Sequence, residues 1–329
     1  MPAINQRPLS IAITMGDPGG IGPEVIWKAL KLLPREERRE FVIIGKEAVM
    51  EDALSLAGPE RVEGVRIEEP ESLKGMDGAV FKTRGRPTPE GGRAAYECIH
   101  AALKGCMKGR FQAMVTAPIS KEALHLAGYN WPGHTEMLAE LTETDSFGMM
   151  LAGGPLRVLL VTTHLPLSEV PRRLSEEGVY EKILLARKGA EMLGIENPKI
   201  GVSGLNPHAG ESGLFGDEEV RIIAPAVERA RAEGLDVTGP MPPDVIFRMA
   251  YLGKLDIVVA MYHDQGLIPL KMIAFDRGVN ITVGLPVVRV SPDHGTAYDI
   301  AWKGVAEPSS MLEAIRTAIT IAENRSERG

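Results

Sequence analysis

Short apolar runs alternate with segments of helical periodicity along almost the whole chain. The runs IVVA and VLLV contain no polar residue, which is typical of parallel strands that helices cover on both faces. We predict strands at residues 10–15, 41–45, 113–118, 147–153, 157–163, 199–204, 256–261 and 280–284. We predict helices at residues 23–33, 46–57, 92–109, 120–127, 175–193, 217–232, 244–253 and 308–324. This alternation predicts an α/β fold.

The length of 329 residues allows two domains or one large domain. Residues 58–91 are rich in Pro and Gly and are predicted to be mostly loop. We expect the two ends of the chain, residues 1–127 and 280–329, to form one α/β domain around a central α/β domain of residues 128–279. No internal repeat interrupts this organisation.

Composition narrows the possible partners. The net charge of −7 argues against nucleic acid or an anionic membrane as a partner, so an anionic substrate would need basic residues gathered locally. No window approaches the roughly 18–20 apolar residues of a membrane span, and we expect no signal peptide. Cys98 and Cys106 lie in one predicted helix, about 12 Å apart, which is too far for a disulfide. A reduced, cytoplasmic setting is therefore expected.

Histidine carries the strongest chemical signal. His100 and His125 lie in helix-like stretches and are interpreted as packing or surface residues. The other five stand among turn formers: His134, His164, His208, His263 and His294. Three of these, His164, His208 and His263, follow strand-like runs, so their imidazoles can converge on one divalent metal such as Zn²⁺, Mn²⁺ or Co²⁺. The alternative is that each caps a turn by hydrogen bonding.

Two other groups of residues carry candidate chemistry. The turn MGDPGGIGPE (residues 15–24) links a strand to a helix, where glycines allow either a close approach to a ligand or simply a tight turn. Lys271, Arg289 and Arg277, with Asn280 between them, could hold a phosphate. Lys271 and Arg289 stand in apolar company, which is unusual for solvated side chains. No Gly-x-Gly-x-x-Gly occurs, so a Rossmann site is unsupported.

The stretch HGTAYDIAWKG (residues 294–304) resembles the adenosine-binding loop of the isocitrate and isopropylmalate dehydrogenase fold, and GIGPE (residues 20–24) resembles its N-terminal signature. The resemblance implies two α/β/α domains with a cleft between them and an NAD(P) site without a Rossmann fingerprint. The implied cofactor-binding residues are His294, Gly295, Thr296 and Asp299. An acidic residue at the position of Asp299 implies NAD, because a carboxylate accepts from ribose hydroxyls and repels a 2′-phosphate.

The chain as a whole resembles the 4-hydroxythreonine-4-phosphate dehydrogenase family. The resemblance rests on MGDPGGIGPE, GHTE, NPHAGESGLFGDEE, MYHDQGLIPLK, GVNITVGLP and SPDHGTA, in that order. It implies that His164, His208 and His263 bind one divalent metal (Zn, Mg, Mn or Co), shared across the interface of a homodimer formed by the central domain. The implied substrate-binding residues are His134, Thr135, Lys271, Asn280 and Arg289.

The implied reaction is NAD-dependent oxidation and decarboxylation of a phosphorylated four-carbon hydroxy acid. APISKEALHLAGYNWPGHTE and AYDIAWKG resemble the D-threonate or D-erythronate 4-phosphate dehydrogenase branch more than the biosynthetic enzyme. Other relatives oxidise a dihydrodiol dicarboxylate. Lys271, Asp264 and Asp244 are candidates for the general base, and each could instead orient a ligand or cap a helix. A zinc hydrolase and a non-catalytic phosphate-metabolite binding protein are the rival interpretations.

Overall fold

The structure is a computed structural model that describes residues 9–328, and it divides the chain into two units. Unit 1 comprises residues 1–143 and 286–329, and unit 2 comprises residues 144–285. Compared with the domain limits expected from the sequence, residues 128–143 and 280–285 are assigned to the opposite unit. Because the chain leaves unit 1 once and returns once, unit 1 is built from both ends of the described chain.

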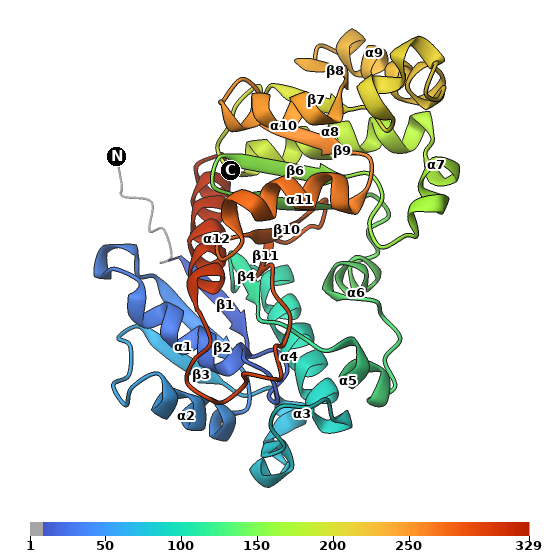
Figure 1. Ribbon diagram of the computed structural model, residues 1–329. Helices are drawn as coiled ribbons and strands as arrows, with labels where there is room; N and C mark the ends of the chain where they lie inside the picture. Colours follow the sequence, from blue (N-terminus) through green and yellow to red (C-terminus); the bar gives the residue numbers. More distant parts are fainter. Residues whose placement is uncertain (1–8, 329) are drawn as a thin grey trace, which may run out of the picture. The chain divides into compact units, whose positions relative to one another are not determined.

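Unit 1 is a parallel sheet with helices packed on it (Figure 1). Its strand order is β3-β2-β1-β4-β11. Its strands are β1 (Ser10–Thr14), β2 (Glu40–Ile44), β3 (Val65–Glu68), β4 (Ala113–Thr116) and β11 (Arg289–Pro292). Its helices are α1 (Gly22–Leu32), η1 (Arg35–Glu37), α2 (Glu47–Leu56), α3 (Glu71–Lys74), η2 (Gly78–Phe81), α4 (Pro89–Met107), α5 (Lys121–Leu126), α6 (His134–Leu141) and α12 (Ser309–Arg328).

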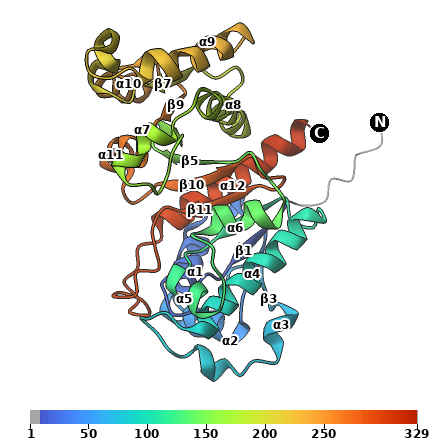
Figure 2. The same cartoon turned by 90° about the vertical axis from the view of Figure 1, so that its right-hand side faces the viewer.

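The core of unit 1 follows directly from its apolar strands. All five residues of β1 are buried, and so is every residue of β4 and β11. Helix α4 packs against α5 and against β1 and β4 (Figure 2). The contact with α5 depends on Gly92, since a Cβ there would lie only 1.9 Å from the carbonyl oxygen of Ala123. A strand buried on both faces reads as a largely apolar run, which is why β1 and β4 were predictable.

Unit 2 carries a mixed sheet. Its strand order is β10-β5-β6-β9-β7-β8, in which β5 is antiparallel to both β10 and β6 and the pairs from β6 to β8 are parallel. Its strands are β5 (Gly148–Gly153), β6 (Leu156–Leu160), β7 (Ile200–Ser203), β8 (Val237–Met241), β9 (Ile257–Ala260) and β10 (Val279–Val283). Its helices are η3 (Leu167–Glu169), α7 (Val170–Arg173), α8 (Glu176–Met192), η4 (Pro207–Gly213), η5 (Glu219–Ile223), α9 (Ala224–Ala232), α10 (Pro243–Tyr251) and α11 (His263–Ala274).

Helices α10 and α11 bury their apolar sides against one face of the unit 2 sheet. Val158 and Leu160 of β6 share a core cluster with Leu267 and Leu270 of α11. Gly266 brings α11 close to the sheet, because a Cβ there would lie 2.7 Å from a methyl carbon of Val158. Helix α8 also packs against this sheet, through contacts with strands from β10 to β7. These contacts fix the start of α11, where His263 stands.

The predicted α/β alternation is present in both units, with three differences. The apolar run of β6 is parallel to β9 but antiparallel to β5, because the short turn at Gly154 joins neighbouring strands as a hairpin. Residues 58–91, expected to be loop, contain β3 as well as short helices. Strands β8 and β11 and helices α6 and α11 were not predicted.

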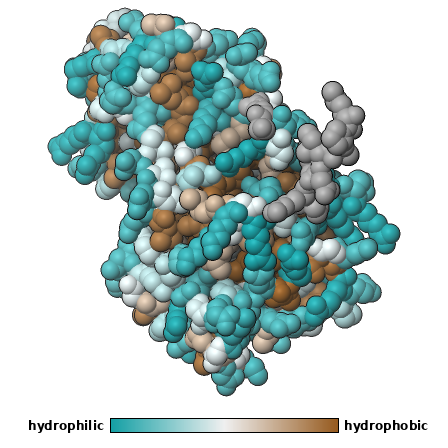
Figure 3. All heavy atoms as spheres, turned by 180° about the vertical axis from the view of Figure 1, so that it is seen from behind, coloured by the Kyte–Doolittle hydropathy of each residue, from teal (hydrophilic) through white to brown (hydrophobic). Residues whose placement is uncertain are grey.

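The surface carries mostly hydrophilic side chains on the face turned away from the view of Figure 1, with smaller hydrophobic areas between them (Figure 3). Within residues 9–328, no helix combines the length and apolar character that crossing a membrane requires.

Candidate functional site

The three predicted metal ligands in unit 2 follow three neighbouring parallel strands. His164 comes shortly after β6, and His208 lies in η4, which follows β7. His263 is the first residue of α11, which follows β9. The sheet order is β6-β9-β7, and both pairs are parallel. The carboxyl ends of parallel neighbours lie at one edge of the sheet, which is where α/β proteins bind ligands. The topology therefore places all three histidines on the same edge.

Two of these imidazoles face each other. The ring centroids of His164 and His263 are 5.6 Å apart, with 41° between the ring planes. Nδ1 of His263 lies 2.7 Å from Oδ1 of Asp264. Because an ionised carboxylate only accepts hydrogen bonds, this contact places the ring proton on Nδ1 and leaves the Nε2 lone pair for a ligand. The contact lets Asp264 orient the ring of His263.

His208 lies on an unusual stretch of backbone. Five residues, from His208 to Ser212, have positive φ angles between 42° and 80°. The buried carboxylate of Glu219 supports this stretch, since it accepts from the backbone N–H of Asn206 at 2.7 Å and from the side-chain amide of Asn206 at 2.9 Å. Strained backbone of this kind persists where surrounding contacts enforce it, and it is found preferentially at functional sites.

A buried glutamine joins the two loops that carry His208 and His263. The side chain of Gln265 accepts from the N–H of Met261 at 2.7 Å and donates to the carbonyl of Gly204 at 2.8 Å. The loop after β9 is therefore tied to the loop after β7. Sequence analysis singled out neither Gln265 nor Glu219, because one polar residue near the start of a helix gives no sign of pointing inward.

The structure does not complete a metal cluster within one chain. Among residues 9–328, no group of three or more His, Cys, Asp or Glu side chains is arranged to hold a metal ion. His164 and His263 are brought together, whereas the aromatic neighbour of His208 is Phe215, with ring centroids 6.4 Å apart.

One side of α11 lines a surface hollow of about 520 Å³. The residues at its wall recur at helical spacing, so that His263 and Lys271 share one side of the helix with apolar neighbours. They are His263, Asp264, Leu267, Ile268, Lys271, Met272 and Phe275. Nζ of Lys271 lies 5.7 Å from the ring centroid of Phe275, a cation–π distance. The hollow thus joins one predicted metal ligand to one predicted substrate-binding residue.

The remaining candidates of unit 2 differ in their surroundings. Oδ1 of Asn280, on β10, is buried and has no hydrogen-bond partner among the described residues. A buried amide oxygen in this state is usually satisfied by a ligand or by water. Asp244 lies exposed in the first turn of α10, where an acidic side chain stabilises the helix N-terminus. Arg277 is exposed.

In unit 1, the predicted substrate-binding arginine is fully enclosed. Arg289 on β11 is 2% exposed, and its Nε and Nη2 atoms donate to Oγ1 of Thr116 at 3.0 and 2.8 Å. Burial lowers the pKa of Arg289 to about 9, and the charge of Glu136 partly opposes this shift. The guanidinium therefore remains charged at neutral pH although it is removed from water. Thr116 holds Arg289 in place and was not predicted from the sequence.

His134 stands at the start of α6, in the same unit. Burial, and then the charge of Arg289, hold the pKa of His134 well below its usual range, so its imidazole is neutral at pH 7. Its Nε2 is buried and has no hydrogen-bond partner among residues 9–328. Thr135, the next residue, is also buried. A charged guanidinium beside a neutral imidazole with an unused nitrogen is suited to an anionic oxygen ligand.

The predicted cofactor loop has no regular secondary structure between β11 and α12. Asp299 is exposed on this loop, while His294 contacts the carbonyl oxygen of Gly295 through Nδ1 at 3.1 Å. Ala297 and Trp302 adopt positive φ angles of 41° and 63°. The loop therefore keeps a conformation that non-glycine residues seldom adopt unless other contacts hold them.

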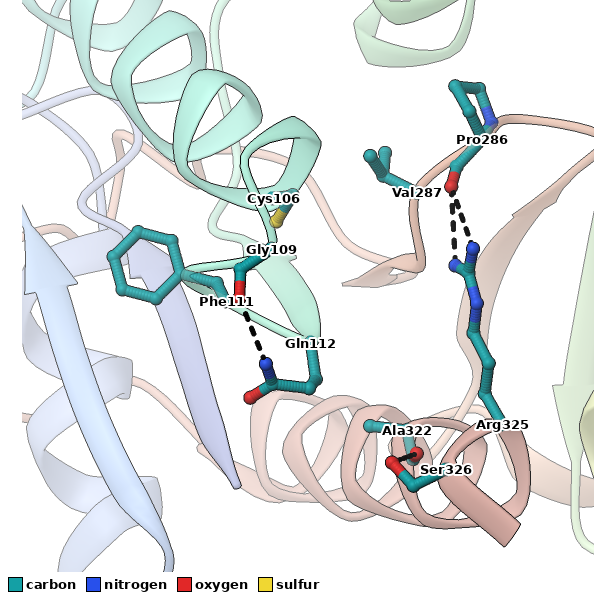
Figure 4. A pocket seen from close by; sticks show the side chains of 9 residues that line it. All are labelled: Cys106, Gly109, Phe111, Gln112, Pro286, Val287, Ala322, Arg325 and Ser326. Carbon is teal, nitrogen blue, oxygen red and sulfur yellow. Dashed lines mark hydrogen bonds between the residues drawn. The ribbon is translucent and has the colours of Figure 1, made fainter. Parts of the chain in front are cut away.

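A further cavity of unit 1, of about 250 Å³, contains none of the predicted site residues (Figure 4). Its polar side chains are engaged with the backbone, because Arg325 donates to the carbonyl of Pro286 and Gln112 donates to that of Gly109. Its wall is formed by Cys106, Gly109, Phe111, Gln112, Pro286, Val287, Ala322, Arg325 and Ser326.

Comparison with known proteins identifies the family. Residues 37–318 match the family described as "Pyridoxal phosphate biosynthetic protein PdxA". The chain belongs to this family. It is 49% identical to 4-hydroxythreonine-4-phosphate dehydrogenase of Beijerinckia indica, over 92% of each chain. It is 45% identical to D-threonate 4-phosphate dehydrogenase of Salmonella typhimurium, over 95% of this chain and 99% of the relative.

Solved structures agree with this assignment. The crystal structure of 4-hydroxythreonine-4-phosphate dehydrogenase from Klebsiella pneumoniae superposes with a TM-score of 0.84 at 42% identity, covering 97% of this chain and 99% of that one. A β-decarboxylating dehydrogenase of Thermococcus kodakarensis, at 16% identity and a TM-score of 0.52, shares the fold alone. The expected isocitrate/isopropylmalate dehydrogenase-like fold is confirmed, as is an oxidoreductase acting on a CH–OH group.

Proposed function

We propose that the chain is an NAD-dependent dehydrogenase that oxidises and decarboxylates a phosphorylated four-carbon hydroxy acid with the help of a divalent metal. The substrates named for its relatives, 4-hydroxythreonine 4-phosphate and D-threonate 4-phosphate, both fit this description. The observation that carries the proposal is the buried, charged Arg289 beside the neutral His134, whose Nε2 is unused among the described residues. Removing a guanidinium from water is costly, so its burial here favours a site built for an anion.

The metal part of the proposal rests on the donor set of unit 2. The 5.6 Å between the rings of His164 and His263, and the carboxylate of Asp264 on Nδ1 of His263, fit two imidazole ligands of one divalent cation. His164, His208 and His263 would hold the cation, which would act as a Lewis acid that lowers the pKa of the substrate hydroxyl and stabilises the enolate formed later. Zn, Mg, Mn and Co remain candidates.

The proposed chemistry balances in two steps. In the first step, the secondary hydroxyl gives its proton to a base. The carbon that bears this hydroxyl gives its hydrogen, as hydride, to the nicotinamide of NAD, which leaves a ketone β to the carboxylate. In the second step, the bond to the carboxylate breaks, CO₂ departs, and the electron pair forms an enolate that is then protonated. Arg289 and His134 would hold the phosphate or carboxylate of the substrate, and Asn280 would offer its buried oxygen to a substrate hydroxyl.

The positions of the three candidate bases favour Lys271. Asp264 is engaged in orienting His263, and Asp244 lies exposed in the first turn of α10. Lys271 lines the same hollow as His263 and is half-buried. We therefore assign proton removal to Lys271 and an orienting role to Asp264.

A homodimer is the remaining part of the proposal. The side of α11 that lines the hollow also exposes large apolar side chains, with Ile268 60%, Met272 82% and Phe275 73% exposed. Apolar side chains exposed beside a site mark a surface that another molecule covers. In the proposed homodimer a second copy covers this surface and supplies its His208 to the His164–His263 pair.

The function is tested with purified protein, NAD, one divalent metal at a time, and a panel of substrates. The panel contains 4-hydroxythreonine 4-phosphate, D-threonate 4-phosphate, D-erythronate 4-phosphate and a cis-dihydrodiol dicarboxylate. We expect NADH and CO₂ in equal amounts from one of the first three acids, and no turnover with chelator. NADH formed only from the dihydrodiol would refute the phosphate site, and hydrolysis without NADH would support the zinc hydrolase instead.

Sharing of the metal between subunits is tested by co-expressing His208→Ala and His263→Ala chains with different tags. Each variant alone should be inactive. The purified mixed dimer should recover about half of the wild-type activity, because one of its two symmetry-related sites would be intact. An inactive mixed dimer would place His208 and His263 in the same subunit's site.

A further inference from the structure

The glycine-rich turn of residues 16–24 and the cofactor loop of residues 294–306 lie against each other within unit 1. The backbone N–H of Ile21 donates to the carbonyl of Thr296 at 3.0 Å. A Cβ on Gly20 would lie 2.9 Å from that same carbonyl oxygen, so no larger residue fits there without displacing the loop. Nε1 of Trp302 donates to the carbonyl of Pro18 at 3.0 Å. The glycines therefore serve a close approach of backbone to backbone.

We propose that this turn is a platform that positions the cofactor loop for NAD, with Asp17 and Glu24 as its positioning residues. The inference rests on the proposed function, with NAD bound by the residues that the sequence analysis expects: His294, Gly295, Thr296 and Asp299. It differs from the simple expectation that the turn itself holds a phosphate, because its side chains and backbone are engaged by the loop.

Asp17 fixes the middle of the loop. Its side chain is 1% exposed, and Oδ2 accepts from the hydroxyl of Tyr298 at 2.6 Å. Oδ1 accepts from the N–H of Gly19 at 2.7 Å, which ties the carboxylate to its own turn. Burial raises the pKa of Asp17, and the hydrogen bonds from Tyr298 and Gly19 oppose that shift. Tyr298 directly precedes Asp299, so the contact holds the residue expected to choose between NAD and NADP.

Glu24 and Lys28 fix the far end of the loop. The buried carboxylate of Glu24, 1% exposed, accepts from the N–H of Ala306 at 2.9 Å and of Gly304 at 3.3 Å. Nζ of Lys28 donates to the carbonyls of the same two residues at 2.9 and 2.8 Å, and to Glu24 at 2.7 Å. The ion pair thus forms hydrogen bonds with both the N–H groups and the carbonyl groups of Gly304 and Ala306.

These contacts explain how an irregular loop keeps its conformation. The positive φ of Ala297 and of Trp302 is a conformation that costs energy in residues other than glycine. The platform offsets that cost before the cofactor arrives. A ligand that meets a preformed loop loses less free energy to ordering, so the platform contributes to affinity without touching the cofactor.

The test compares Tyr298→Phe, Asp17→Asn and Glu24→Gln with the exposed Tyr251→Phe as a matched control. The dissociation constant for NADH is measured by fluorescence titration of the full protein, with kcat and the KM for NAD measured on the active substrate. We expect the dissociation constant to rise about tenfold, equivalent to about 1.4 kcal/mol, for Tyr298→Phe and Glu24→Gln. The kcat at saturating NAD should stay near the wild-type value, and Tyr251→Phe should change nothing.

The possible results separate the platform from the function on which it rests. If wild-type protein binds NADH and Tyr298→Phe and Glu24→Gln bind it equally well, the platform is refuted and the function stands. If wild-type protein binds no NADH, both are refuted. A fall in kcat with an unchanged NADH affinity would also overturn the positioning role. Tyr298→Phe removes only one hydroxyl and should fold, so it still tests the platform if Glu24→Gln does not fold.

Discussion

Replacement of Arg289 by Met separates the functional from the structural contribution of the buried cation. The variant keeps much of the apolar length of the side chain and removes the charged guanidinium, which donates hydrogen bonds to Thr116. If Arg289 holds an anionic group of the substrate, removing it loses a charge-assisted hydrogen bond worth about 1.5–3 kcal/mol, or roughly a ten- to 150-fold rise in KM. The thermal stability of the protein should not fall with the affinity for substrate.

The expected effect on stability follows from the pKa of Arg289. Burial lowers that pKa from the ordinary value of an arginine side chain to about 9. The folded protein therefore binds this proton less tightly than the unfolded chain does. Below pH 9 both states are protonated and the folded state bears the cost of burying the charge, which is on the order of a few kcal/mol. Removing the charge should leave the melting temperature unchanged or raise it, whereas most core substitutions lower it.

The assay combines steady-state kinetics with thermal unfolding in the presence and absence of inorganic phosphate. Wild-type protein should be stabilised by phosphate, and Arg289→Met should not. Arg325→Met, which removes an exposed guanidinium of the same unit that donates to the carbonyl of Pro286, is the control and should respond as wild type does. An unchanged KM together with an unchanged phosphate response would show that Arg289 does not bind the anion.

Three further variants test other parts of the structure. His134→Gln should flatten the pH dependence of stability, because the lowered pKa of His134 makes its contribution complete above about pH 6.5 and lost as pH falls below that value. The melting temperature should therefore fall less steeply from about pH 7 into acid for the variant than for wild type, and parallel curves would contradict the assignment. Asp299→Lys should shift the ratio of kcat/KM from NAD toward NADP, and an unmoved ratio would show that Asp299 does not meet the ribose. Gly92→Ala should lower the free energy of unfolding by about 1–3 kcal/mol, because its Cβ would meet the backbone of Ala123, whereas Gly75→Ala, with nothing within 4 Å, should be neutral in denaturant titration.

Much of the fold was predictable because most of its strands are buried on both faces. Such strands read as continuous apolar runs, as β6 and β9 do. Helix α11 was missed for the opposite reason. It exposes Ile268 and Met272 while burying Leu267 and Leu270, so apolar residues occur around much of the helix and show no clear period. Pro269 inside the helix hides it further.

The candidate site was predictable in its residue types but not in its supports. Histidines that follow apolar runs can be placed at strand ends, and the order β6-β9-β7 puts the three of them on one edge. Arg289 could be suspected because it interrupts an apolar run. Thr116, Gln265 and Glu219 could not, since which polar side chain at the end of a strand or the start of a helix faces inward depends on packing that a single sequence does not encode.

The environment of Arg289 also explains how a chain of net charge −7 can bind a phosphorylated acid. A surface cluster of lysines would be screened within about 8–10 Å at physiological salt, and the acidic surroundings would weaken it further. A cation enclosed in the protein is screened much less, and it attracts an anion more strongly once that anion has entered. The neutral state of His134 fits the same design, because a second charge beside Arg289 would raise the cost of the empty site. Binding that depends on such an enclosed cation should weaken far less with added salt than binding to exposed lysines would.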